Sequence, residues 1–261
     1  MVLAQIVLVV GAAILGIMIA LWILSLHLRN SSIVDIFWGT GFVISAWIGF
    51  ALTPEGALLR KLLLCALVSL WGLRLSLHIL LRNWGKPEDF RYRAWREEAG
   101  PSWWWRSFFK VFLLQGVLMW IVAAPLVVAQ FASRPAEMTV WDGAGVVLCA
   151  IGFFFEAVGD GQLTRFKSDP ANKGKLLTTG VWRYTRHPNY FGDAAQWWGF
   201  FLLAVAAGGW WTVFSPIVMT TLLVRVSGVA MLEKTLATTK PGYREYIETT
   251  SAFIPRPPRR R

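Results

Sequence analysis

The residues best suited to chemistry lie in one polar segment, Asp160 to Asp193, of a chain that is otherwise mostly apolar. A segment this polar between two apolar spans either lies in water or lines a water-filled site. It carries six basic residues and an acid at each end, and cations of this kind bind phosphates while carboxylates and amides bind hydroxyl and amide groups. We therefore expect an anionic ligand with polar groups, held by residues drawn from Asp160, Lys167, Lys173, Lys175, Tyr184, Arg186, His187, Asn189, Tyr190 and Asp193.

The composition indicates a polytopic membrane protein. Of 261 residues, 56% are hydrophobic and only 16% are charged, and a soluble core of this size could not bury so much apolar surface. The net charge of +11 is typical of nucleic-acid binding only in a soluble protein; here the cations gather in loops, so we expect no nucleic-acid partner. Cys65 and Cys149 lie in apolar runs and the three histidines are scattered, which gives no metal-ligand spacing.

The pattern predicts an all-α fold with seven transmembrane helices, because seven apolar runs have about the length that a helix needs to cross a bilayer. The N-terminal run has no charged segment before it and is expected to be a retained span. The runs lie near residues 3–27, 33–53, 60–81, 109–130, 142–159, 193–208 and 210–229. We expect one membrane domain over residues 1–254, followed by a basic tail, 255–261, that contacts membrane lipids.

The loop charges predict the orientation. The segments 82–110, 160–193 and 230–261 hold seven, six and seven of the 26 Lys and Arg residues. Seven spans place all three segments on one side, which the positive-inside rule makes cytoplasmic. The N-terminus is then outside and the C-terminus cytoplasmic, in a membrane that we expect to be the bacterial inner membrane.

Ionisable residues within the spans predict a polar cavity. Each costs about 2.5–3.5 kcal/mol near a helix centre, and all fall in the predicted cytoplasmic half. Snorkelling explains a single arginine near a helix end, but it does not explain the acids. The residues are Asp35, Arg74, His78, Glu156, Asp160, Asp193 and Arg225. In the amphipathic loop that follows the third span, Asp89, Arg91 and Tyr92 are expected at the rim of this cavity.

Three motifs resemble the steroid 5α-reductase family, in particular its bacterial branch of membrane reductases. They are GVWRYTRHPNYFGDAAQWWG from Gly180, the run Glu233–Tyr246 with the pattern E-x(7)-P-x-Y-x-x-Y, and TSAFIP from Thr250. The upstream segments WGLRLSLHILLR and EDFRY fit the family too, so that the resemblance covers most of the chain from about Ile33. The RHPNY core is also shared with sterol reductases and with isoprenylcysteine and phospholipid methyltransferases.

The resemblance implies a cofactor, NADPH, and a set of residues around it. Glu156 and Asp160 match a pair that contacts the cofactor, and Lys167 and Lys175 match residues that hold phosphate. Asn189 and Asp193 match residues at the nicotinamide end, with Trp197 at the following family position. Arg225 matches a cofactor-binding arginine, and Glu233 stands where mammalian members have tyrosine. With these we group Arg74, Tyr184, Arg186, His187 and Tyr190 as cofactor-binding residues.

The resemblance also implies an activity, that of an NADPH-dependent oxidoreductase acting on CH–CH groups in lipid or steroid metabolism. The family reduces the Δ4 double bond of 3-oxosteroids, and we expect a steroid-like or other enone lipid that enters from the bilayer. Asp35 matches the catalytic acid of the family, and the tyrosine that partners this acid aligns near Trp71, whose indole offers no acidic proton. A donor aimed at the substrate carbonyl would stabilise the enolate formed by hydride addition.

Two other functions fit parts of the pattern. A membrane methyltransferase that uses S-adenosylmethionine shares the RHPNY segment, although its cofactor has no phosphate for the basic residues to bind. A non-enzymatic lipid or sterol binder would use the basic loop only to meet anionic headgroups. For Asp35 in particular, the alternative is a simple cap of the helix that begins there.

Overall fold

The computed structural model describes residues 1–226 and 228–259, apart from the side chains of Ala230, Met231, Lys234 and Thr235. Every regular element within these residues is helical. The contacts gather in two compact units: the first comprises residues 1–139 and 203–212, the second 140–202 and 213–261. The prediction of an all-α protein is confirmed for the described residues. The single domain over 1–254 stays a prediction, because a division of contacts does not test whether the units fold separately.

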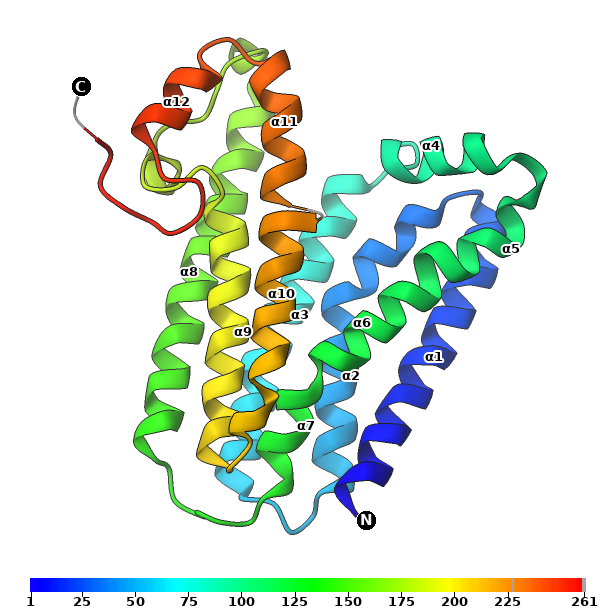
Figure 1. Cartoon of the computed structure of the whole chain (residues 1–261), viewed down its shortest axis with the longest axis vertical. Helices are drawn as coiled ribbons and strands as arrows, with labels where there is room; N and C mark the ends of the chain where they lie inside the picture. Colours follow the sequence, from blue (N-terminus) through cyan, green and yellow to red (C-terminus); the bar gives the residue numbers. More distant parts are fainter. Residues whose placement is uncertain (227, 260–261) are drawn as a thin grey trace. The chain divides into compact units, whose positions relative to one another are not determined.

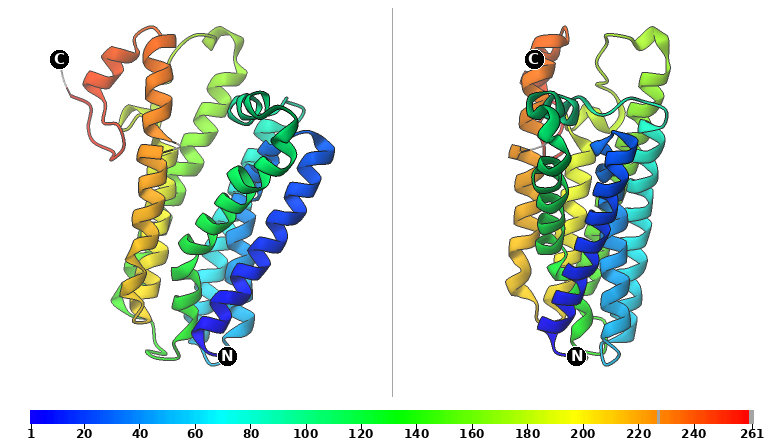
Figure 2. Two further views of the ribbon diagram at one scale, coloured as in Figure 1. Left: turned by 45° about the vertical axis from the view of Figure 1, so that its right-hand side comes forward. Right: turned by 90° about the vertical axis from the view of Figure 1, so that its right-hand side faces the viewer.

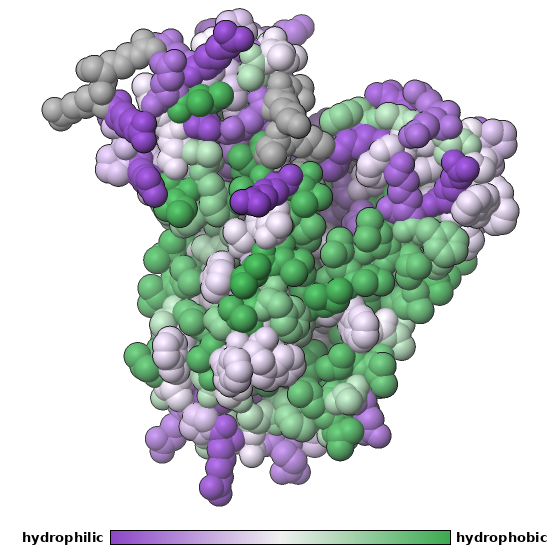
Figure 3. All heavy atoms as spheres, viewed as in Figure 1, coloured by the Kyte–Doolittle hydropathy of each residue, from purple (hydrophilic) through white to green (hydrophobic). Residues whose placement is uncertain are grey.

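Five stretches of the described chain are long and apolar enough to cross a membrane, which indicates a membrane protein. They correspond to the first five predicted spans and are Leu3–Leu28, Ser31–Leu52, Leu58–Asn83, Phe90–Phe131 and Val140–Ser168. The predicted sixth span corresponds to helix α9, Pro188–Ala206, and the seventh to the shorter apolar stretch Trp210–Val226. Figure 3 shows hydrophobic residues along the lengths of the helices and hydrophilic residues gathered near helix ends.

The first unit is built on three long helices: α1, Leu3–Leu28; α2, Phe37–Leu52; and α3, Leu58–Asn83. Helices α2 and α3 cross at backbone contact, because a Cβ added at Gly39 would lie 2.2 Å from the carbonyl oxygen of Gly72. Trp71 is fully buried and packs against Phe42 of α2, with ring centroids 5.9 Å apart. The 3-10 turn η1, Ser31–Ile36, joins α1 to α2, and Asn30 caps it by accepting from Ser32 N at 3.0 Å.

The remaining helices of the first unit begin with α4, Phe90–Ala99, which lies across one end of α1 and α2 (Figure 1). Asp89 caps it by accepting from the backbone N–H of Arg91 at 3.0 Å. The chain then passes through η2, Gly100–Ser102, α5, Trp103–Ser107, the π-helical turn η3, Phe108–Leu113, α6, Leu114–Val122, and α7, Ala124–Phe131. The unit thus places α4 beside η1, where Asp35 lies.

The second unit is organised around α8, Val140–Ser168, and α9. A Cβ at Gly152 would lie 2.5 Å from the carbonyl oxygen of Gly192, and one at Gly199 would lie 2.8 Å from that of Gly145. Small residues at these positions let the two backbones approach closely, as they do in membrane helix pairs. This approach fixes which polar side chains of α8 and α9 can meet.

After α9 the chain of the second unit resumes in α10, Phe214–Thr221, and continues through the π-helical turn η7, Leu222–Val226. Helix α11, Val229–Thr239, runs on in the direction of α10, and α12, Tyr243–Thr249, folds back beside the loop between α8 and α9 (Figure 2). That loop contains the 3-10 turns η4, Pro170–Asn172, and η5, Gly180–Arg183. A further turn, η6, Trp210–Val213, precedes α10. Of the predicted basic tail, residues 255–259 are described, while Arg260 and Arg261 lie outside the described residues.

Candidate functional site

Two pairs of polar side chains connect α8 to α9 in the second unit. Gln196 donates from Nε2 to Glu156 Oε2 at 2.7 Å, and Asn189 donates from Nδ2 to Asp160 Oδ1 at 3.1 Å. Glu156 and Asp160 are four residues apart on α8, and Asn189 and Gln196 are seven apart on α9, so each pair of positions shares one helix face. Both acids are buried, with 2% and 6% exposure. We call these four residues the α8–α9 polar seam.

Polar seam residues present carboxylate and amide groups, which suit the hydroxyl and amide groups of a ligand. The resemblance had placed three of them, Glu156, Asp160 and Asn189, at the cofactor, and the structure brings these three to one helix pair. Gln196 was missed. It follows Asn189 by seven residues and Asp193 by three, so the helical period was the signal that could have found it.

A second cluster in this unit joins the segment just before α9 to α11, and we call it the Glu233 latch: Arg186, His187 and Glu233. Arg186 donates from Nε to Glu233 Oε1 at 2.8 Å and forms an ion pair with the same oxygen through Nη2, at 2.7 Å; His187 Nε2 lies 3.3 Å from it. Burial alone would raise the pKa of Glu233, but its hydrogen bonds to His187 and Arg186 outweigh this and hold the pKa below its ordinary value. The imidazole of His187 also stacks on Tyr190, with ring centroids 5.7 Å apart.

The residues beside the latch bind the C-terminal segment through backbone carbonyls. Arg186 donates from Nη1 to the carbonyl oxygens of Thr250 and Ile247, and its backbone N–H donates to Ser251 O at 2.9 Å. Thr185 donates from Oγ1 to Phe253 O at 2.8 Å. The conformation of residues 185–187 is therefore tied to that of residues 247–253. Sequence reasoning missed these contacts, because carbonyl acceptors leave no mark in a sequence pattern.

Two tyrosines of α12 complete the packing against this region. Tyr246 donates from its hydroxyl group to Trp182 O, and burial raises its pKa. Burial also raises the pKa of Tyr243 to about 12, with a further contribution from the nearby charge of Glu233. Both phenols are therefore neutral at physiological pH; Tyr246 serves as a hydrogen-bond donor, and Tyr243 packs against its ring.

The other predicted cofactor residues are spread over different environments. Lys167 on the last turn of α8, Lys175 in the following loop and Arg225 on η7 are exposed, and Tyr184 is 44% exposed. Asp193 and Trp197 are buried on α9, and Arg74 is half-buried on α3 in the first unit. The exposed cations are accessible to a phosphate, whereas the side chain of Arg186 is 6% exposed and engaged by the latch.

A third cluster lies in the first unit, where α4 meets η1, and we call it the Asp35 cluster: Asp35, Asp89, Arg91, Tyr92 and Gln115. Tyr92 donates from its hydroxyl group to Asp35 Oδ1 at 2.5 Å, and Arg91 Nη2 lies 3.3 Å from Asp35 Oδ2. Gln115 donates from Nε2 to the Tyr92 hydroxyl oxygen at 3.1 Å. The sequence had placed Arg91 and Tyr92 near the cavity; it did not predict their direct contact with Asp35, nor Gln115.

Asp89 holds Arg91 from the other side. Arg91 Nε donates to Asp89 Oδ1 at 2.9 Å. Burial alone would raise the pKa of Asp89, but its hydrogen bonds with Arg91 hold the pKa below the ordinary value. Asp89 is thus a carboxylate at neutral pH, and it fixes the guanidinium group against Asp35.

The same helix has an independent anchor to η1. Arg96 donates to both carboxylate oxygens of Glu88 at 2.9 Å, and Glu88 Oε1 accepts from the backbone N–H of Ser31 at 2.6 Å. Trp103 Nε1 donates to Ser31 Oγ at 3.2 Å. Contacts other than those of Tyr92 therefore already hold α4 in place.

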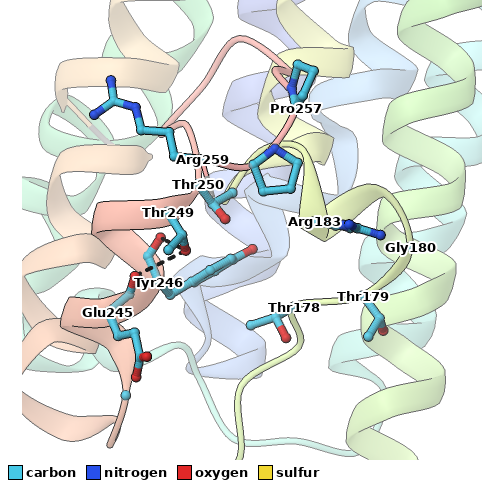
Figure 4. Close-up of a pocket in the computed structure, with 12 residues that line it drawn as sticks. Thr178, Thr179, Gly180, Arg183, Glu245, Tyr246, Thr249, Thr250, Pro257 and Arg259 are labelled. Carbon is cyan, nitrogen blue, oxygen red and sulfur yellow. Dashed lines mark hydrogen bonds between the residues drawn. The ribbon is translucent and has the colours of Figure 1, made fainter. Parts of the chain in front are cut away.

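A cavity of about 890 Å³ opens in the second unit between the loop before η5, α12 and the C-terminal segment (Figure 4). Threonine hydroxyl groups and the ring of Tyr246 line it, together with Arg183 and Arg259. None of its lining residues belongs to the predicted cofactor set. Within the described residues no group of three or more His, Cys, Asp and Glu side chains could hold a metal ion.

The helices and their polar clusters define an all-helical membrane protein, and comparison with known proteins gives its family. Residues 21–250 match the family described as "Protein of unknown function (DUF1295)", and the chain belongs to this family. The chain is also similar to the uncharacterized protein C594.04c of Schizosaccharomyces pombe, with 26% identity over 265 residues that cover 90% of this chain and 76% of that protein. No solved structure gives a significant match.

Proposed function

We propose that this protein is an NADPH-dependent membrane reductase that acts on the C=C bond of an enone lipid such as a Δ4-3-oxosteroid, as in the steroid 5α-reductase family that its motifs resemble. The observation that carries this proposal is the set of polar groups on α8 and α9: the pairs Glu156–Gln196 and Asp160–Asn189, near the start of a loop that carries exposed lysines. Such groups have no purpose in a helix pair that only crosses a membrane, where their burial is costly.

The residue types fit NADPH. Lys167 and Lys175 are exposed cations that would bind its phosphates, and more than one cation suits a cofactor with a 2′-phosphate as well as a pyrophosphate. Asp160, Asn189 and Asp193 offer carboxylate and amide groups that would bind ribose hydroxyls and the carboxamide of the nicotinamide. The bound cofactor would supply the hydride, and the protein would orient its substrate and exclude water.

The latch gives the RHPNY motif a structural part in this assignment. Arg186 and His187 are held by Glu233, and through the segment that follows α12 they fix the start of α9. The start of α9 is where Asn189 and Asp193 lie. Arg186 and His187 would therefore position cofactor-binding residues, and Tyr190, stacked on His187, would be positioned with them.

Substrate recognition belongs to Asp35 and its neighbours in the first unit. The side chains of Asp35 and Arg91 are 20% and 29% exposed, whereas Tyr92 is buried, with 4% exposed, so the cluster is accessible from the side of Asp35 and Arg91. A few solvent-accessible polar groups among otherwise apolar helices suit a ligand that is mostly apolar and has one carbonyl group.

For the membrane arrangement we propose seven crossings around a cytoplasm-facing cavity, with α9 and the stretch Trp210–Val226 as the sixth and seventh. The basic segments that flank α4, that join α8 to α9 and that follow α11 then share the cytoplasmic side, and the N-terminus is outside. The membrane would be the bacterial inner membrane, and the substrate would reach the protein from the bilayer.

The test is a direct titration of the detergent-purified protein with NADPH and, separately, with S-adenosylmethionine, followed by product analysis with an enone. The reductase proposal expects saturable NADPH binding and consumption of one NADPH for each enone double bond reduced. Saturable binding of S-adenosylmethionine instead would identify a methyltransferase, and a protein that binds lipid but neither cofactor would be a non-enzymatic binder. Either of these results rejects the reductase.

A further inference from the structure

The first unit has an exposed group of aromatic and basic side chains where the chain passes from α4, through η2, into α5 and η3. We call it the Arg106 corner: Trp104, Trp105, Arg106, Phe109 and Lys110. All five side chains are exposed. The backbone beneath them is held in place, because Trp104 O accepts from Trp22 Nε1 of α1 at 2.9 Å. The fold itself therefore directs these aromatic rings outward.

The position of the corner indicates what covers it. It belongs to a stretch that is long and apolar enough to cross a membrane, Phe90–Phe131. Helix α4 lies across one end of α1 and α2, and Figure 3 shows hydrophilic residues gathered at this end beside hydrophobic helix surfaces. Large aromatic residues exposed at such a boundary are typical of the headgroup level of a bilayer, where one ring meets both water and acyl chains. The surface facing the corner is therefore a lipid surface.

Two cations stand among these rings. The guanidinium group of Arg106 lies over the ring of Trp105, 5.5 Å from its centroid, and Arg106 forms no ion pair within the part of the chain that the structure describes. Lys110 Nζ lies 4.0 Å from Glu98 Oε2, at the outer limit of an ion pair, and both side chains are exposed. Exposed pairs of this kind contribute little to stability. Both cations are thus available to an external anion.

The two cations also lie on the same side of the helix. Trp105 and Phe109 are four residues apart, and their ring centroids lie 6.4 Å from each other, edge to face. The backbone changes from α5 to the π-helical turn η3 between them, so this contact shows that positions four apart still meet there. Arg106 and Lys110 have the same spacing one residue further along. Both can therefore reach one headgroup.

We propose that the Arg106 corner binds the phosphate of an anionic phospholipid, with its two cations on the phosphate and its aromatic rings beside the ester groups and upper acyl chains. Arginine and lysine both form charge-assisted hydrogen bonds with phosphate oxygens. In phosphatidylcholine the quaternary ammonium group cancels the charge of the phosphate, so the two cations favour an anionic lipid such as phosphatidylglycerol. The sequence had placed lipid contact at the basic tail, 255–261, whereas this site belongs to the first unit.

The alternative is that the rings only anchor the helix at the interface while both cations remain in water. An aromatic anchor meets every phospholipid alike, because all of them share the glycerol esters and the acyl chains. Phosphate binding by the two cations depends on the net charge of the headgroup. Selectivity between lipids therefore separates the two roles.

The experiment follows the fluorine resonance of Trp105 in full-length protein labelled with 5-fluorotryptophan, assigned by its loss in Trp105→Phe. The protein is placed in phosphatidylcholine nanodiscs with increasing fractions of phosphatidylglycerol. The wild-type resonance should shift and saturate. Arg106→Gln and Lys110→Gln should each raise the midpoint fraction about fivefold, since a basic residue near an anionic membrane contributes about 1 kcal/mol. Arg106→Lys keeps the charge and should retain most of the affinity.

Arg93→Gln is the matched control, because it removes an equal exposed charge of α4 outside the corner, and its midpoint should stay within twofold of the wild type. The Tm of Arg106→Gln should equal that of the wild type, since this side chain makes no hydrogen bond to a described residue. A wild-type shift that does not saturate, or an equal effect of Arg93→Gln and Arg106→Gln, would mean a general surface potential and overturn the site.

Two further outcomes would replace the proposed occupant. Soluble glycerol 3-phosphate carries a phosphate group without acyl chains and should leave the Trp105 resonance unchanged at millimolar concentration. If it displaces phosphatidylglycerol instead, the corner binds a soluble phosphate and not a lipid. If nanodiscs hold two copies of the chain that separate in Arg106→Gln, the occupant is a second copy of this protein.

Discussion

Arg186 contacts one oxygen atom of Glu233 with two nitrogens, through a hydrogen bond from Nε at 2.8 Å and an ion pair with Nη2 at 2.7 Å, although 47 residues separate them in the chain. The third nitrogen of the same guanidinium group donates to the carbonyl oxygens of Thr250 and Ile247. Arginine has a rigid fork of five N–H donors, and here the fork joins the segment before α9 to α11 and the end of α12. This single side chain therefore connects the motif that precedes α9 to both helices that end the chain.

The first prediction concerns this latch and pH. The pKa of Glu233 is lowered in the folded state, so its stabilising contribution is present above the ordinary carboxyl pKa of 4.5 and is lost as pH falls through the folded-state pKa. Thermal unfolding in detergent should show that Glu233→Gln lowers Tm at pH 7. The difference in Tm between the variant and the wild type should shrink as the pH is lowered below 4.5.

Arg186→Ala supplies the comparison for the latch, since it leaves Glu233 with only His187 and removes the side-chain donor of two carbonyl groups; it should cost about 3–5 kcal/mol, as for a broken buried pair. A constant difference in Tm between wild type and Glu233→Gln from pH 7 to pH 3 would contradict the lowered pKa. So would a larger difference at low pH.

The second prediction concerns the contact of α8 with α9. A Cβ at Gly192 would lie 2.5 Å from the backbone N of Glu156, and backbone atoms cannot move aside as a flexible side chain can. Gly192→Leu should therefore separate the helices, break the contacts of the polar seam and lower Tm by several degrees. Gly161→Ala on α8 is the control: a Cβ there meets nothing within 4 Å, and the change should stabilise the helix by about 0.5–1 kcal/mol.

Periodicity and apolar length predicted most of the fold, because five apolar stretches leave a clear mark in the sequence. The two later stretches were harder to predict. Helix α9 has the polar residues Asn189 and Asp193 near its start, and the last apolar stretch is short and ends in the π-helical turn η7. The sequence also does not reveal π-helical turns, since no residue pattern is specific to them.

For the candidate site, the sequence predicted residue types better than contacts. Glu156 and Asp160 were selected as a pair and Asn189 separately, and the structure brings the three together because Gly152 and Gly192 let their helices touch. In contrast, nothing in the sequence pairs Arg186 with Glu233, or Tyr92 with Asp35, because both pairs join distant segments through tertiary packing alone. The lysines of the polar loop are exposed as expected of cations, and their exposure does not by itself identify a ligand.

The third prediction concerns orientation in the membrane. If the three basic segments share the cytoplasmic side, an alkaline phosphatase fused after Arg261 should be inactive and a green fluorescent protein fused there should be fluorescent in cells. The same reporters fused within the loop between α2 and α3, at Gly56, serve as the opposite-side control. Active alkaline phosphatase at the C-terminus would place this end outside the cytoplasm. That result would reject the arrangement of seven crossings with the N-terminus outside.

The last prediction concerns the choice of cofactor. NADPH differs from NADH only by the 2′-phosphate, so a lysine that binds this group contributes to the affinity for NADPH alone. Lys175→Ala should weaken NADPH binding by about 1–3 kcal/mol, the range of a hydrogen bond to a charged group, and leave NADH binding nearly unchanged.

Lys240→Ala, which removes an equal charge at the end of α11, is the control for a general loss of positive potential. Because long-range attraction is screened at high salt, raising the ionic strength should reduce the loss of NADPH affinity caused by Lys240→Ala. Most of the loss caused by Lys175→Ala should remain. Equal losses for NADPH and NADH in Lys175→Ala would mean that this lysine meets the pyrophosphate, and the 2′-phosphate would then belong to Lys167.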